Sequence, residues 1–153
     1  MNTIKKIIIS TSAVLIGFLF LNNNRKGDPK DSLDKRIFTV TVSEVKEGSP
    51  PKKGVEDEIE FKAGKAFSNF LYEKHEFKWT KYEIKKDSTF VDEEQNEVKW
   101  VEAEIKATDD SDQTLIVTLK VENYEINGEI KITKKDKLKK KYEFSGKEKA
   151  KKK

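Results

Sequence analysis

From residue 36 onward, apolar and polar side chains alternate along the chain with a period of two residues. This alternation is typical of β-strands that bury one face and expose the other to solvent. A helical period fits only residues 70–77, for at most two turns. The pattern therefore predicts about eight antiparallel strands, and the clearest runs are Phe38–Val42, Ile59–Phe61, Tyr82–Ile84, Leu115–Val121, Tyr124–Ile132 and Leu138–Phe144.

Turn-forming residues separate these runs. Ala63-Gly64-Lys65 predicts a tight hairpin turn, and Glu47–Gly54 holds two prolines and two glycines, which predict an irregular loop. The acidic clusters at 92–94 and 109–112 are expected at hairpin tips, because Asp and Asn favour turns.

One run changes phase. Val98 and Trp100 share one face, whereas Val101, Ala103 and Ile105 continue on the other. A one-residue phase change in an apolar strand predicts a β-bulge at this place. A meander with one apolar face must cover that face, and closing into an up-and-down barrel does so while removing exposed edges. A β-sandwich is the alternative architecture.

The first 21 residues have a different pattern. Lys5 and Lys6 precede an apolar run, Ile7–Leu21, which predicts a signal helix for export. No small-x-small triplet follows the run, so an uncleaved N-terminal membrane anchor is the alternative. Residues 22–35 contain one apolar side chain and are expected to form a flexible linker before a domain at 36–147.

Charge is distributed unevenly along the chain. Residues 22–130 carry 18 basic and 25 acidic side chains, and residues 131–153 carry 12 lysines and 3 acids. The lysine-rich end, 148–153, is expected to be a disordered solubilising tail; docking on an anionic surface is the alternative. No nucleic-acid-binding motif accompanies these lysines, so we expect no nucleic-acid partner, and membrane contact only through the N-terminal segment.

Several short motifs carry a resemblance to a known family. They are Phe61-Lys62-Ala63-Gly64-Lys65-Ala66-Phe67-Ser68, Phe77 with Tyr82, Ile126-Asn127-Gly128, and Tyr142-Glu143-Phe144-Ser145-Gly146. Together they resemble small exported bacterial proteins of the lipocalin-like (calycin) type. The resemblance implies an eight-stranded up-and-down barrel with an apolar interior, in a periplasmic or secreted protein.

Aromatic residues from separate strands are the candidate binding residues. Most fall on phases that point inward, where they form core or line a site for a small hydrophobic ligand. The polar tips of Tyr82, Trp100 and Tyr142 would orient such a ligand. The full candidate set is Phe61, Phe70, Tyr82, Trp100, Tyr142 and Phe144.

Catalytic chemistry finds little support. The chain has one histidine, His75, and no cysteine, and it lacks a Gly-x-Ser-x-Gly elbow and a glycine-rich phosphate loop. We therefore expect no enzyme, no metal site and no cofactor, and we expect His75 to lie in a loop. Two functions remain open: an exported binding protein for a small hydrophobic ligand, or a cell-envelope structural or interaction module with a filled core.

Overall fold

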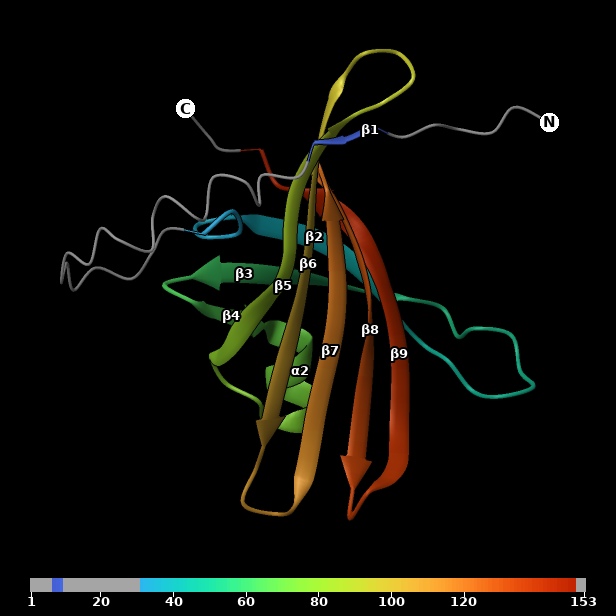
Figure 1. Ribbon diagram of the computed structural model, residues 1–153. Helices are drawn as coiled ribbons and strands as arrows, with labels where there is room; N and C mark the ends of the chain where they lie inside the picture. Colours follow the sequence, from blue (N-terminus) through green and yellow to red (C-terminus); the bar gives the residue numbers. More distant parts are fainter. Residues whose placement is uncertain (1–6, 10–30, 151–153) are drawn as a thin grey trace, which may run out of the picture.

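The computed structural model describes residues 7–9 and 31–150 of the chain (Figure 1). The described residues are almost entirely β-structure with one short helix, as the alternation predicted. The elements are β1 (Ile7–Ile9), β2 (Ile37–Glu44), β3 (Val55–Lys62), β4 (Lys65–Ser68), α2 (Asn69–His75), β5 (Thr80–Val91), β6 (Glu97–Thr108), β7 (Gln113–Glu122), β8 (Glu125–Lys134) and β9 (Lys137–Glu148).

Strands β2 to β9 form a ring-like meander. Each strand pairs antiparallel with the next in sequence, and β2 pairs with β9 to join the two ends of the series. All eight belong to one continuous sheet, whereas a sandwich would have two separate sheets. The prediction of about eight antiparallel strands is confirmed.

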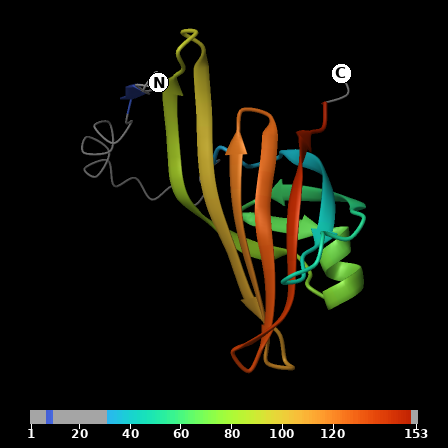
Figure 2. The same cartoon turned by 90° about the vertical axis from the view of Figure 1, so that its right-hand side faces the viewer.

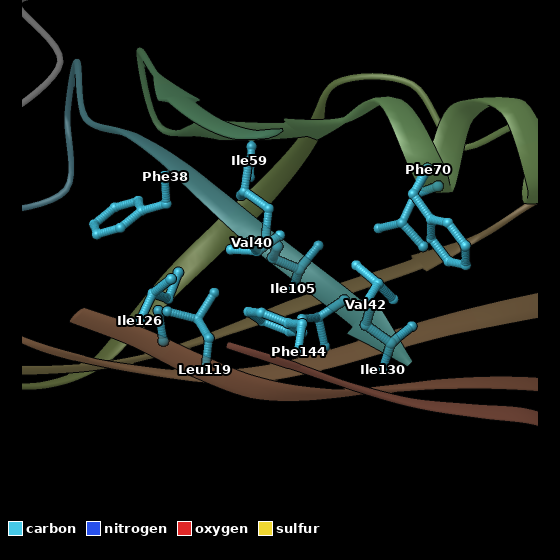
Figure 3. Packing of buried hydrophobic residues seen from close by; sticks show 14 of the residues in the cluster. Phe38, Val40, Val42, Ile59, Phe70, Ile105, Leu119, Ile126, Ile130 and Phe144 are labelled. Carbon is cyan, nitrogen blue, oxygen red and sulfur yellow. The ribbon is translucent and has the colours of Figure 1, made fainter. Parts of the chain in front are cut away.

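The core lies inside this ring. Phe38, Val40 and Val42 of β2 are nearly inaccessible to solvent, and the residues between them are exposed. Figure 3 shows these side chains meeting those of β7, β8 and β9 between the strands. Burial of alternate residues on β2, β3, β7, β8 and β9 supplies much of the hydrophobic driving force that a chain without disulfides requires.

Helix α2 lies at one end of the ring, beside β3 and β4. Ser68 is its N-cap, and its hydroxyl accepts a hydrogen bond from the Leu71 N–H at 3.1 Å. The first turn buries Phe70 and Leu71 against the core, and the chain leaves the helix through Glu76 in the left-handed region. His75 is thus the last residue of a helix, where a loop was expected.

The opposite end of the ring is covered by a turn at residues 31–35. Its Leu33 side chain is fully buried, and the Lys35 N–H donates to the Phe61 carbonyl at 2.8 Å. This part of the expected linker is therefore ordered, because its one apolar side chain fills the end of the core. The expected tail also begins later than 148, since Glu148 pairs with Arg36 at 2.8 Å and the Lys149 N–H donates to the Ile37 carbonyl.

The expected bulge lies in β5 and not in β6. Pairing between these strands skips Lys85, whereas β6 keeps a continuous register with β7. The extra residue turns the rest of β5 over, so that Ser88 and Phe90 point to the outside of the ring, opposite Trp100 and Val98. The phase change in β6 arises because its two ends bury opposite faces.

Two predicted inward residues lie outside the core. Leu138 is 57% exposed because the β8–β9 pairing skips Lys139, which turns the start of β9 outward. Tyr124 is 71% exposed because it lies in the β7–β8 turn, next to Asn123 with its positive φ of 52°.

The predicted signal helix at 1–21 lies mostly outside the described residues. The part that is described, β1, is a three-residue strand paired with β5. Within the described ranges, no helix is long and apolar enough to cross a membrane.

Candidate functional site

Two of the candidate aromatic residues pack together near the Leu33 end of the ring. The Phe61 ring meets the rings of Phe38 and Tyr82 edge-to-face, with centroids 5.9 Å and 5.2 Å apart. The Tyr82 hydroxyl donates to the carboxylate of Asp31, at 2.8 Å and 2.7 Å from its two oxygens. Burial, followed by this hydrogen bond, raises the pKa of Tyr82 far above its ordinary value. The Tyr82 hydroxyl therefore holds the 31–35 turn in place.

Two more candidates meet at the α2 end. The Phe70 and Tyr142 rings are 5.0 Å apart and nearly perpendicular, and the Tyr142 hydroxyl lies 3.1 Å from Nε2 of His75. Burial lowers the pKa of His75, and the positive charges of Lys140 and Lys74 lower it further. Burial also raises the pKa of the Tyr142 hydroxyl. This cluster closes the end of the core under the helix.

The last two candidates lie on opposite sides of the sheet. Phe144 is buried inside the ring, opposite Gly128 of β8, where a Cβ would come within 2.5 Å of the phenyl ring. Trp100 points outward: its indole N–H donates to the Glu102 carboxylate at 2.9 Å, and its ring lies near Phe90. The six candidates therefore do not converge on one site.

The cavity under α2 is very small. A cavity between α2, Phe77 and the inner faces of β6, β7 and β9 has a volume of about 20 Å³. Sites for drug-sized ligands usually have volumes of roughly 300–1,000 Å³, so this space holds about one water molecule. Asp57, Ser68, Lys78 and Thr80 are the polar residues on its wall, and Asp57 and Ser68 are hydrogen-bonded to each other.

The larger hollow lies on the outer face of the ring. It is an open groove of about 710 Å³ over β6, β7, β8, β9 and β2. Two rows of directly paired outward residues form its floor. One row runs Glu102, Lys120, Asn127, Ser145, Thr41, and the other runs Glu104, Thr118, Glu129, Glu143, Ser43.

In the first row, short amide and hydroxyl side chains follow one another from Asn127 to Thr41, whereas the second row carries three carboxylates, Glu104, Glu129 and Glu143. Glu129 accepts from Lys131 and Lys141 at 2.7 Å each, which lowers the pKa of its carboxylate. Lys85 reaches Glu104 at 3.7 Å from the β5 side. The groove thus presents hydrogen-bonding groups and carboxylates, and the apolar residues Ala103, Leu119 and Phe144 also contribute to its lining.

The sequence interpretation missed this groove. Its residues occupy the solvated phase of each strand, which the alternation marks only as exposed. The available signal was the concentration of short Thr, Ser and Asn side chains on that phase in β2, β7, β8 and β9, where lysine and glutamate dominate elsewhere. Bringing these residues into two rows also requires the register of the strands, which alternation alone does not give.

The acidic side chains at the hairpin tips stabilise the turns in which they lie. The Asp109 carboxylate accepts from the Ser111 and Gln113 N–H groups, and that of Asp92 accepts from Glu94 and Asn96 in the same way. These hydrogen bonds lower the pKa of both aspartates. In the described part of the chain, no three histidine or carboxylate side chains gather as a metal-binding cluster.

Comparisons of the chain with protein-family models, with curated proteins and with solved structures give no significant match. None of them identifies a lipocalin-like protein. The function is therefore argued from the chain's own geometry.

Proposed function

We propose that this protein is a non-catalytic cell-envelope interaction module that recognises a polar or basic protein segment in the groove on its outer face. The observation that carries the proposal is the contrast between the two hollows. The cavity under α2 has about 20 Å³, whereas the outer groove offers about 710 Å³. A filled core supports a rigid scaffold, and the groove is the part of that scaffold with room for a partner.

The chemistry of the groove indicates the kind of partner. Thr41, Thr118, Asn127 and Ser145 offer hydroxyl and amide groups suited to an extended peptide backbone. The carboxylates of Glu102 and Glu143 lack a lysine partner among the ion pairs of the described residues, so their charge remains to attract Lys or Arg. Such attraction between exposed charges weakens as salt increases.

Substitution within the groove tests this proposal. Recovery of the partner from extracts of the source cells is compared for two variants. Asn127→Arg places a long cation on the groove floor, and Asn69→Arg makes the same change at an exposed position of α2. We expect salt-sensitive recovery that Asn127→Arg abolishes and Asn69→Arg preserves. Equal recovery by both variants would contradict the groove as the binding site.

The alternative proposal is binding of a small hydrophobic ligand inside the ring. In its favour, the 20 Å³ cavity is lined mainly by apolar side chains and lies directly under Leu71 and Phe77, so displacement of this covering segment would enlarge it. Native mass spectrometry of protein purified from its source tests this alternative. A retained small-molecule mass would favour the ligand-binding function, and a bare protein mass favours the filled module.

The proposal also includes a closed, lipocalin-like barrel and a location outside the cytoplasm. The pairing of β2 with β9 supports closure of the ring as a lipocalin-like barrel. Lys5, Lys6 and the apolar run after them support export to the periplasm or exterior, with the segment either removed or kept as an anchor. Detection of the mature N-terminus in fractionated cells tests both points of location.

A further inference from the structure

A further hollow lies at the α2 end of the molecule, where the loop after β2 passes the helix. Figure 2 shows α2, in green, next to the cyan end of β2 from which this loop departs. The hollow is a cleft of about 250 Å³, and it shares no lining residue with the groove on the outer face. We call it the loop cleft. Its lining combines apolar side chains with lysines, and each part is described in turn.

The apolar part of the loop cleft comes from β2, β3, α2 and β9. Val42 lies directly opposite Val55 in the β2–β3 pairing, and both line the cleft. The rings of Phe70 and Tyr142, 5.0 Å apart, also contribute to the lining. Val55 is 53% exposed although it is apolar. A ligand with a small apolar group would remove this surface from water, which is favourable.

The rest of the lining is mainly basic. Lys52, Lys53 and Lys74 line the cleft together with one carboxylate, that of Glu44. Both oxygens of Glu44 are already used, because one accepts from Lys52 at 2.9 Å and the other from Lys140 at 2.6 Å. Among the ion pairs of the described residues, Lys53 and Lys74 have no carboxylate partner. Two positive charges at the cleft therefore remain without an opposite charge.

Acidic residues line the neighbouring hollow. Glu56, Glu58 and Glu73 lie there, and Lys74 lines both hollows. None of these three glutamates lines the loop cleft. Positive charge is thus concentrated on the side of the loop cleft. Ammonium groups bind the oxygens of carboxylates and phosphates through charge-assisted hydrogen bonds.

We infer that the loop cleft binds a small organic anion, a carboxylate or phosphate carried on a compact apolar group. The apolar group packs on Val42, Val55 and Phe70. The anionic oxygens accept hydrogen bonds from Lys53 and Lys74. The volume of about 250 Å³ is below the roughly 300–1,000 Å³ of sites for drug-sized ligands, which favours a ligand with a single ring. This site is separate from the outer groove, whose carboxylates favour the opposite charge.

Titration calorimetry of the full chain tests the class of ligand. Phenylacetate and phenyl phosphate each combine a ring with an anionic group, whereas phenylethanol lacks the charge and acetate lacks the ring. We expect the tighter of the two ring anions to bind at least about tenfold more tightly than either control. Equal affinity for a control, or no binding of both ring anions at about 10 mM, would overturn the inference.

Charge reversal tests the place of binding. Lys53→Glu with Lys74→Glu reverses the two lysines of the cleft that have no carboxylate partner. Lys62→Glu with Lys65→Glu is the control, because these exposed lysines lie opposite each other on β3 and β4, away from the cleft. We expect the first pair to weaken binding of the ring anion about tenfold or more, and the control pair to change it less than about twofold. Equal weakening by both pairs would assign binding to overall charge and overturn the inference.

Replacement of the exposed valine tests the apolar contact. Val55→Asn removes an apolar side chain from the cleft, and Leu138→Asn makes a similar change at another exposed strand residue, outside the cleft. Circular dichroism checks that both variants are folded. We expect Val55→Asn to weaken binding of the ring anion about threefold or more, and Leu138→Asn to leave it unchanged. The same affinity in both variants would overturn the assignment of the ligand to this cleft.

Discussion

The hydroxyl of Ser68 donates a hydrogen bond of 2.6 Å to the buried carboxylate of Asp57. The other carboxylate oxygen of Asp57 accepts from the Phe70 N–H at 3.0 Å, in the first turn of α2. One side chain on β3 thus secures both the N-cap of the helix and an N–H group that the helix leaves unpaired. This contact fixes α2 over the end of the core.

Asp57→Ala is expected to lower the free energy of unfolding by about 2–4 kcal/mol, because both donors are left buried without a partner. Asp57→Asn keeps the shape and one acceptor oxygen, and should cost about 1 kcal/mol. Urea titration followed by circular dichroism measures both values. Equal, negligible losses for the two variants would contradict a structural role for this carboxylate.

Leu33→Ala is expected to lower the free energy of unfolding by about 3 kcal/mol, because it opens a cavity at the end of the core. Leu33 is fully buried, whereas Leu138 is 57% exposed. Leu138→Ala is therefore the matched control and should change stability by less than about 0.5 kcal/mol. Thermal unfolding of both variants gives the comparison, and similar losses would place Leu33 outside the core.

Leu33 and Leu138 also show which features of the fold the sequence predicts and which it does not. Alternation identified the inner residues of β2, β7 and β8 correctly, because burial of one sheet face imposes a period of two. It placed Leu138 inside and left Leu33 in a linker. A bulge at Lys139 and the packing of a turn over the end of the ring depend on contacts between distant residues, which a local pattern does not contain.

The candidate site shows the same limit. Phe61, Phe70, Tyr142 and Phe144 are buried as expected, but Trp100 faces outward because the bulge at Lys85 lies in the partner strand. The groove was missed because its rows form only through the register of five strands. Sequence reasoning thus identified most of the residues that are inside, and could not identify which outward residues stand together.

His75→Gln is expected to make stability less dependent on acid. Burial holds the pKa of His75 below its unfolded value of 6.5, so the folded state keeps this imidazole neutral. The resulting stability is present above pH 6.5 and is lost as the pH falls through the lowered folded pKa. The wild type should therefore lose more stability than His75→Gln between about pH 7.5 and about pH 5, measured by urea unfolding.

Glu44→Gln is the control for this titration. The lysines Lys140 and Lys52 hold the pKa of Glu44 at about 2, so this carboxylate stays ionised over the same interval. Its replacement should not alter how steeply the free energy of unfolding changes with pH in this interval, although it alters that dependence at lower pH. If His75→Gln left the pH dependence of the free energy of unfolding unchanged, the imidazole would not change its protonation on unfolding.

Gly146→Ala is expected to lower the free energy of unfolding by about 2–4 kcal/mol. A Cβ there would lie 1.9 Å from the Thr39 carbonyl oxygen, where β9 passes against β2. Gly48→Ala is the comparison: this glycine has φ of 74° and no neighbouring atom within 4 Å, so alanine should cost only about 1 kcal/mol. Equal losses would show that the strands separate readily at Gly146.

The pairing that joins β2 to β9 also governs how the protein reaches its fold. The Arg36–Glu148 contact beside this pairing links residues 112 positions apart. Contacts of such long sequence separation form slowly, because a large loop must be ordered first. Until β9 has been synthesised, β2 and β8 each present an open edge, which invites aggregation. A nascent or C-terminally truncated chain is therefore the species in most need of a chaperone.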